Sequence, residues 1–125
     1  DRPLVIATRE AGEGRFRAGG REWTARWGPE GDGAGEDERT MRIGVDRVCF
    51  PLTLRGRAPG DRVRTRAGTR PLKKVLGEAR VPLRRRAALA VLADAAGAVL
   101  WVPGVVRAEG CAPGPGEQSI TLSVI

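Results

Sequence analysis

The sequence has no histidine and no tyrosine, and it has only two serines and two cysteines among 125 residues. Without an imidazole, neither a Ser-His-Asp triad nor a histidine-based zinc site can form. Ser119 and Ser123 have no base partner in the sequence, so it offers no activated serine. Cys49 and Cys111 lie far apart without neighbouring ligand residues, and we expect no metal site and no disulfide framework. These absences argue against catalysis by this chain.

Long apolar runs are also absent. No stretch approaches the roughly 20 residues of a membrane-spanning helix, and the N-terminus shows no signal-peptide pattern. A length of 125 residues is typical of one compact domain, so we expect residues 1–125 to form a single domain. The chain begins with Asp1 instead of methionine, and we expect it to be a piece of a longer protein. We expect that protein to be cytoplasmic.

Positive charge is concentrated in one part of the chain. The whole sequence carries 22 Lys and Arg against 15 Asp and Glu, a net charge of +7. Residues 55–86, called the basic segment below, contain twelve basic and two acidic residues and carry +10, whereas the rest carries −3. Because guanidinium groups suit phosphate oxygens, the basic segment favours a polyanionic partner. A solvated basic face without a partner is the alternative from charge alone.

Short apolar stretches separated by turn residues predict sheet in the first third of the chain. We expect strands at residues 4–7, 15–17 and 23–27 and a turn at residues 12–14. Trp23 and Trp27 share one face of the third strand, which predicts that they cover the core. Residues 28–38 contain five acids, four glycines and one proline without a large apolar residue, so we expect a mobile acidic surface loop.

The centre of the chain leads from strands into the basic segment. Residues 42–54 predict two strands, and Arg55 and Arg57 continue the period of two. Both side chains would project from one edge about 7 Å apart, a spacing that suits successive phosphates. Residues 58–61 predict a tight turn in which a short acidic residue, Asp61, caps the backbone and orients a neighbouring arginine.

Helical periodicity is strongest at residues 69–79. The apolar positions fall on one helix face, Pro71 suits the first turn, and Thr69 or Arg70 would cap the helix. The residues expected on this core-facing stripe are Leu72, Val75, Leu76 and Ala79. Lys73, Lys74 and Arg80 would then point to solvent. A second short helix with three arginines is expected after Pro82.

The last third returns to strand-like sequence. We expect a buried strand at residues 99–102, its resumption at 105–106 and a closing strand at 119–125, whereas residues 89–92 fit either a helix end or a strand. This order predicts the α+β class, a sheet-rich single domain with a short basic helical insertion.

Three stretches in and after the basic segment carry a specific motif order. They read LRGRAPGDRV at 54–63, PLKKVLGEARVP at 71–82 and VLWVPG at 99–104. This order of an Arg-rich Gly-Asp-Arg turn, a lysine-containing helix ending near Val-Pro and a Trp-Val strand resembles the C-terminal domain of tRNA(Ile)-lysidine synthase. The clear match covers about residues 52–104. The fold implied is a sheet-rich domain shared with part of the β subunit of phenylalanyl-tRNA synthetase.

The resemblance also implies a function. Enzymes of this family convert the wobble cytidine of a minor isoleucine tRNA to lysidine with ATP and lysine, and their C-terminal domain is taken to bind the tRNA acceptor stem. ATP and Mg would bind in the catalytic domain, an implied partner whose Ser-Gly-Gly-x-Asp-Ser loop this sequence lacks. We therefore expect a non-catalytic tRNA-binding domain without a cofactor of its own. The expected tRNA-binding residues are Arg55, Arg57, Arg62, Lys73, Lys74, Arg84, Arg85 and Arg86, with Gly60 and Asp61 shaping the turn.

Two other functions are weighed against this one. The basic face could dock on an acidic protein surface, such as the catalytic half of the same enzyme, which would make the chain a structural or protein-interaction domain. An independent hydrolase is disfavoured because the sequence has no histidine and no nucleophile with a base. For Arg86 alone, a structural salt bridge competes with an RNA contact.

Overall fold

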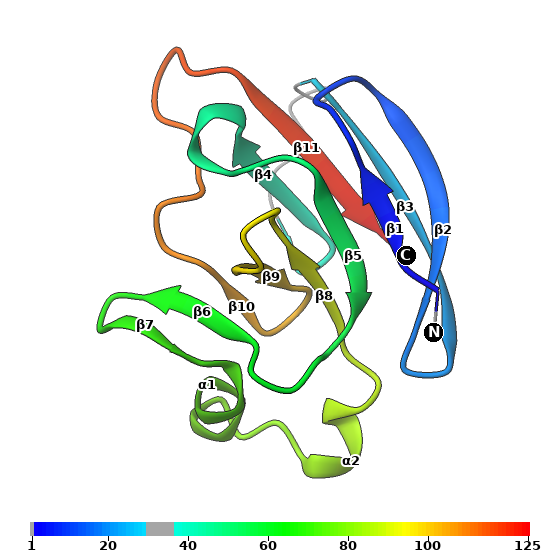
Figure 1. Cartoon of the computed structure of the whole chain (residues 1–125), viewed down its shortest axis with the longest axis vertical. Coiled ribbons are helices and arrows are strands. Elements are labelled where there is room, and N and C mark those ends of the chain that lie inside the picture. The colour runs from blue at the N-terminus through cyan, green and yellow to red at the C-terminus, as the bar shows by residue number, and fades with distance from the viewer. Residues whose placement is uncertain (1, 30–36) are drawn as a thin grey trace.

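The computed structural model describes residues 2–29 and 37–125. Within these residues the chain forms two β-sheets, two short α-helices and one 3-10 turn (Figure 1). The strands are β1 (Leu4–Ile6), β2 (Gly12–Ala18), β3 (Arg21–Pro29), β4 (Thr40–Gly44), β5 (Leu52–Gly56), β6 (Arg62–Thr65), β7 (Gly68–Pro71), β8 (Ala90–Ala93), β9 (Val99–Val102), β10 (Val106–Arg107) and β11 (Ser119–Val124). The helical elements are η1 (Val45–Arg47), α1 (Leu72–Glu78) and α2 (Leu83–Arg86).

The first sheet is antiparallel and has the strand order β2-β3-β11-β4. Alternation along β2 and β3 buries every second residue, including Phe16 and Trp23, while the intervening side chains face solvent. The last strand of the chain, β11, lies between β3 and β4, so the closing strand is central to this sheet (Figure 1).

The second sheet has the order β1-β5-β8-β9-β6-β7, and β10 also pairs with β9. Its strand pairs are antiparallel except for β6 beside β9, which is parallel with Val63 opposite Val99. All four residues of β8 and all four of β9 are buried. These strands are continuous apolar runs because both faces of the sheet are covered.

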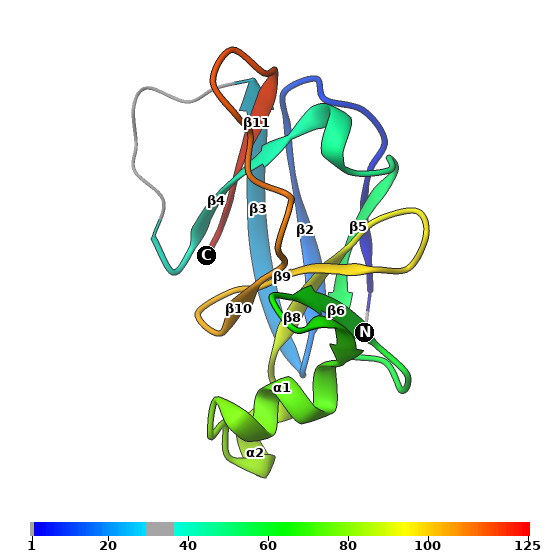
Figure 2. The ribbon, with the colours of Figure 1, turned by 90° about the vertical axis from the view of Figure 1, so that its left-hand side faces the viewer.

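Two apolar cores account for that burial. Leu92 and Trp101 point into the core between the two sheets, in the same apolar cluster as Phe16 of the first sheet. Val91 and Val99 point the other way, into a smaller core that α1 and the residues on either side of α2 close. The members of this smaller core are Val63, Leu72, Leu76, Val81, Leu89, Val91, Val99 and Val102. Figure 2 shows the two helices together at one end of the molecule, beside β6.

The first helix is shorter than its apolar period predicts. It begins at Leu72, and the expected caps Thr69 and Arg70 belong to β7 instead. The reason is Pro71, whose ring disfavours the α conformation for the preceding residue and so extends the chain before the helix. At the other end, Ala79 lies beyond the last helical residue and is exposed, contrary to its expected place on the buried stripe.

Four other local expectations change in the structure. Residues 12–14 continue β2 instead of turning, because Gly12 and Gly14 leave room for the side chains of Trp27 and Leu4. Gly28 and Pro29 extend β3, so part of the expected loop is strand; residues 30–36 of that loop lie outside the described residues. Residues 105–106 do not prolong β9, because the chain reverses and β10 pairs antiparallel with it. The β6–β7 hairpin inside the expected helical insertion was not predicted.

Candidate nucleic-acid interface

The turn after β5 is organised around the Asp61 carboxylate. It accepts hydrogen bonds from the Arg55 guanidinium, at 2.8 Å from Nη2 and 3.2 Å from Nη1, and from the Ala58 amide at 2.8 Å. Gly60 has a φ of +83°, a left-handed conformation that is strained for any residue with a side chain. The backbone carbonyl of Asp61 also accepts the amide of Leu72, so the turn holds the first residue of α1.

Arg55 therefore faces the protein more than solvent. Its side chain is 25% exposed and that of Asp61 only 7%, and Arg55 also donates to the carbonyl of Gly56 at 2.8 Å. Arg57 lies just after β5 and is partly buried, with its Nε atom inaccessible and without a hydrogen-bond partner among the described residues. Of this predicted pair, one guanidinium is held by a carboxylate and the other is partly covered.

The β6–β7 hairpin presents two arginines on one face. Val63 is fully buried, so its neighbours Arg62 and Arg64 lie on the opposite face of the short strand, and both are exposed. They line a groove of about 530 Å³, which Asp94 and Glu109 also line. Arg62 donates only a long bond of 3.4 Å, to the carbonyl of Thr69. Sequence reasoning selected Arg62 but not Arg64, although the Arg-Val-Arg alternation signals that both share a face.

The cations on and beside helix α1 divide into paired and unpaired ones. Glu78 forms an ion pair with Arg70, and this hydrogen bond from the guanidinium lowers the pKa of Glu78 and raises the pKa of Arg70. Leu72 and Leu76 bury the opposite face of the helix. Lys73 and Lys74 are exposed and form no ion pair within the described part of the chain, so their ammonium groups are available to a partner.

The three arginines of helix α2 also divide into exposed and bonded ones. Arg84 and Arg85 are exposed, whereas Arg86 is partly buried and donates through Nε to the carbonyl of Val81 at 2.9 Å. Arg86 thus holds the connection between the two helices through a backbone hydrogen bond, not through the salt bridge that competed with an RNA contact. The apolar side chain of Leu83, next to these arginines, is 78% exposed.

The structure thus separates the twelve cations of the basic segment by their partners and their exposure. Arg55, Arg66 and Arg70 form ion pairs with carboxylates, Arg86 bonds to the backbone, and Arg57 is partly buried. Seven exposed cations form no ion pair with any carboxylate in residues 2–29 and 37–125; they are Arg62, Arg64, Lys73, Lys74, Arg80, Arg84 and Arg85, called the unpaired cations below. The hairpin and helices that carry them gather at one end of the molecule (Figure 1).

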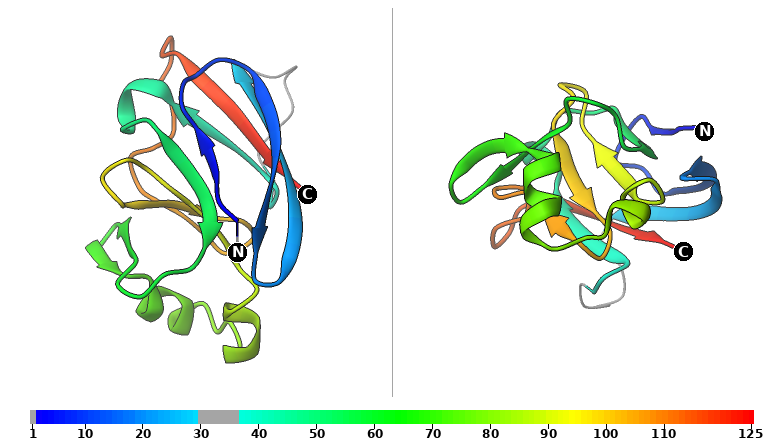
Figure 3. Two further views of the ribbon diagram at one scale, coloured as in Figure 1. Left: turned by 45° about the vertical axis from the view of Figure 1, so that its right-hand side comes forward. Right: turned by 90° about the horizontal axis from the view of Figure 1, so that it is seen from below.

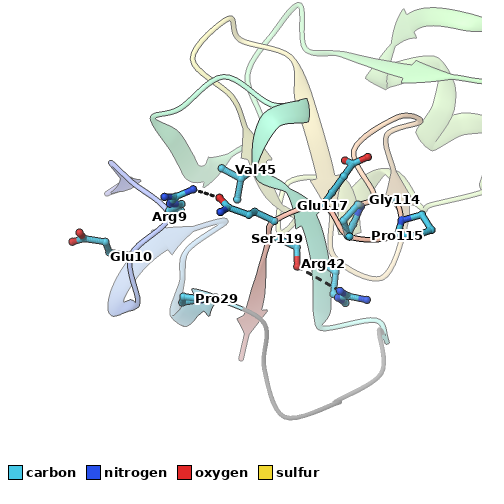
Figure 4. Close-up of a pocket in the computed structure, with 12 residues that line it drawn as sticks. Arg9, Glu10, Pro29, Arg42, Val45, Gly114, Pro115, Glu117 and Ser119 are labelled. Atoms are coloured by element: carbon cyan, nitrogen blue, oxygen red, sulfur yellow. Dashed lines mark hydrogen bonds between the residues drawn. The ribbon is translucent and has the colours of Figure 1, made fainter.

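A second cavity lies at a distance from this end and has a different character. It measures about 830 Å³ and is lined by prolines and by polar groups from β4, the chain before β2 and the loop before β11. Its polar side chains are bonded to one another, as Arg9 to Gln118 and Arg42 to Ser119 (Figure 4). Nearby, two hydrogen bonds from Arg47 lower the pKa of Glu117 to about 2. These internal bonds leave fewer groups here for a ligand than at the helical end.

The described residues contain no cluster of three or more His, Cys, Asp or Glu side chains that could hold a metal ion. In the same part of the chain, no helix has the length and apolarity needed to cross a membrane. Cys49 is exposed and Cys111 buried, and burial raises the pKa of the Cys111 thiol.

The fold and the basic end define a sheet-rich domain built to present cations, and comparison with known proteins identifies its family. The family model described as TilS substrate C-terminal domain matches residues 52–124. The chain belongs to this family, which confirms the resemblance seen in the motif order.

Named relatives agree with the family. The chain is 46% identical over 65 residues to a tRNA(Ile)-lysidine synthase of Exiguobacterium sibiricum, which covers 52% of this chain and 16% of that protein. It is 40% identical over 81 residues to the tRNA(Ile)-lysidine synthase of Symbiobacterium thermophilum, covering 63% of this chain and 17% of that protein. A bifunctional protein TilS/HprT of Listeria monocytogenes is 36% identical over 69 residues, or 54% of this chain and 11% of that protein. The chain spans less than a fifth of the length of these relatives.

A solved structure extends the likeness to the whole chain. The crystal structure of a TilS C-terminal domain matches with a TM-score of 0.69 and covers 98% of this chain and 96% of that one, at 24% identity. This likeness confirms the sheet-rich α+β fold. The expected kinship with phenylalanyl-tRNA synthetase stays a prediction.

Proposed function

We propose that this chain is the tRNA-binding domain of a tRNA(Ile)-lysidine synthase and that it holds the acceptor stem of a minor isoleucine tRNA. The observation that carries the proposal is the set of seven unpaired cations on β6, α1, α2 and the residues between the helices. The relatives are tRNA-modifying enzymes, which supports tRNA as the polyanionic ligand of this basic surface.

The chemistry of the surface suits a base-paired RNA stem. A-form RNA presents phosphates and 2′-hydroxyls across a wide minor groove, and proteins bind it mainly through these groups. Lys and Arg supply the positive charge and the donors that such contacts need. Arg62, Lys73, Lys74, Arg84 and Arg85 are the predicted contacts that remain exposed, and Arg64 joins them from the structure. Arg55 and Arg86 then act by shaping the turn and the helix connection.

The chemical step would lie elsewhere in the parent enzyme. The chain lacks histidine and a Ser-Gly-Gly-x-Asp-Ser loop, and we propose that ATP, Mg and lysine are bound by a catalytic domain with which this one cooperates. In this arrangement the present domain binds tRNA without catalysing a reaction. Such an enzyme would work in the cytoplasm.

The salt dependence of RNA binding tests the proposal. About six phosphate contacts predict a log–log slope of the association constant against salt of about −5. K73A/K74A should weaken binding of the minor isoleucine tRNA and flatten this slope by about two while leaving the fold intact. R15A/R26A is the matched control, because it removes two exposed arginines from the outer face of the first sheet. A slope near zero for the unmodified chain would overturn the proposal in favour of a protein partner.

A further inference from the structure

A cavity beside α2 brings together three arginines that are far apart in the sequence. It measures about 490 Å³ and is lined by Arg21 at the start of β3, Arg39 just before β4 and Arg85 of α2. Only Arg85 belongs to the basic segment. Trp23, Leu89 and Glu38 also line the cavity. Of the three arginines, none forms an ion pair with a carboxylate in the described ranges 2–29 and 37–125.

Arg21 is held in place by an aromatic platform. Its guanidinium carbon lies 4.0 Å from the centroid of the Trp23 ring, within the range of a cation–π contact. Trp23 is itself fixed, because its indole N–H donates to the carbonyl of Ala18 at 3.2 Å and its ring stacks on Phe16 with centroids 5.8 Å apart. The guanidinium is therefore positioned before any ligand arrives, which lowers the entropy cost of binding.

The other two arginines are held through their backbones. The carbonyl of Arg39 accepts the amide of Val124 at 2.9 Å, which ties it to the end of β11. Helix α2 is held by the β2–β3 turn, where a Cβ at Gly19 would lie 2.3 Å from the Cα of Ala88. Figure 3 shows α2 directly below the end of this hairpin. The β2–β3 turn and the chain just after α2 are therefore in close contact beside this cavity.

The charges around the cavity are unbalanced. Three arginines and one acidic residue, Glu38, line it in the described structure. Like charges that line one cavity repel one another, and solvent ions screen this repulsion only in part over distances near the Debye length, about 8 Å at physiological salt. An anion with several acceptor oxygens would relieve the repulsion, and the planar donor fork of arginine matches phosphate.

We infer that Arg21, Arg39 and Arg85 form a binding site for backbone phosphate of the RNA. The inference rests on the proposed function and deepens it, because it extends the RNA-binding surface from the basic segment onto the first sheet. An RNA strand that crosses α2 would then continue over the β2–β3 turn toward β4. The first sheet and α2 would then contact one strand of the ligand.

The variant R21Q/R39Q tests the site without touching the basic segment. If each guanidinium contacts a phosphate, the dissociation constant for tRNA should rise roughly tenfold per residue and the salt slope should flatten by about two. R15Q/R26Q removes the same charge from the outer face of β2 and β3 in the same sheet and should change both quantities much less. Equal effects of the two variants would overturn the inference while the proposed function stands.

Further arms separate the remaining outcomes. If the unmodified chain shows no salt-dependent binding of tRNA, the proposed function and the inference fail together. If inorganic phosphate shifts the Trp23 indole resonance as strongly as RNA does and R21Q/R39Q binds tRNA normally, the cavity takes a free phosphate and the inference is wrong. Should R21Q/R39Q lose its fold, R39Q replaces it, because the side chain of Arg39 makes no hydrogen bond or ion pair in the described structure. Coupling between R39Q and R85Q in a double-mutant cycle supports the shared site, and strict additivity contradicts it.

Discussion

Replacing Asp61 by alanine should destabilise the fold more than replacing either of two other ion-paired acids, Glu78 or Glu117. The substitution removes the acceptor of three hydrogen bonds at the turn after β5, two from Arg55 and one from the amide of Ala58. It also leaves the Arg55 guanidinium, only 25% exposed, without its counter-charge. The turn also accepts a hydrogen bond from the first backbone amide of α1, so the effect should reach the helices of the proposed interface.

The size of the loss follows from the burial of the pair. Breaking a fully buried ion pair costs about 3–5 kcal/mol, because the remaining charge is left without a partner. Water can reach one quarter of the Arg55 side chain, which places the expected loss at the lower end, about 3 kcal/mol. With a urea m-value of about 1.5–2 kcal/mol/M, the midpoint of unfolding should fall by about 1.5–2 M.

Urea unfolding followed by tryptophan fluorescence measures this change, since Trp101 is fully buried in the core between the sheets. Glu78→Ala is the matched control. It also removes a carboxylate paired with arginine, but Glu78 is 62% exposed, and such surface pairs contribute little to stability because solvent screens them. A loss for Asp61→Ala no larger than that for Glu78→Ala would refute the reasoning.

The double variant R55A/D61A distinguishes the charge from the rest of the turn. If the cost of Asp61→Ala comes from an unpaired guanidinium, removing Arg55 as well should restore about 1 kcal/mol or more. Purely additive losses would show that Asp61 acts through the amide of Ala58 alone.

Two further predictions concern packing and pH. Gly19→Ala should lower the free energy of unfolding by at least about 2 kcal/mol and weaken tRNA binding, because the new Cβ would overlap Ala88 and the φ of +62° is strained for alanine. Gly20→Ala is the control: its φ is +75° but the space around it is open, so it should cost only the backbone strain of about 1 kcal/mol. Equal losses for the two variants would contradict the close approach of Gly19 to Ala88. Thermal unfolding against pH should show that the Glu117–Arg47 pair stabilises the fold: the pKa of Glu117 is lowered to about 2, so the advantage over Glu117→Gln is full above its usual pKa of 4.5 and disappears as pH falls toward 2. A constant difference across that range would rule out the pair as its source.

Sequence reasoning was most successful where local pattern decides structure. Alternation predicted strands in the regions of β2 and β3 and the burial of Trp23, and the continuous apolar run predicted β9 as a buried strand. It was wrong where a neighbour in space decides. The predicted helix at residues 69–79 was too long, because residues 69–71 belong to β7, which pairs with β6, and α1 begins only at Leu72.

The candidate site divides in the same way. The amino-acid sequence by itself determined that positive charge is concentrated in residues 55–86 and that the motif order is that of one family, because charge counts and motifs are properties of the chain alone. Only the tertiary structure decided which cations are available. Arg55 is held by Asp61, six residues away, whereas Arg21 and Arg39 join Arg85 across more than forty residues of sequence. Both results depend on distances between folded segments, and no local periodicity carries that information.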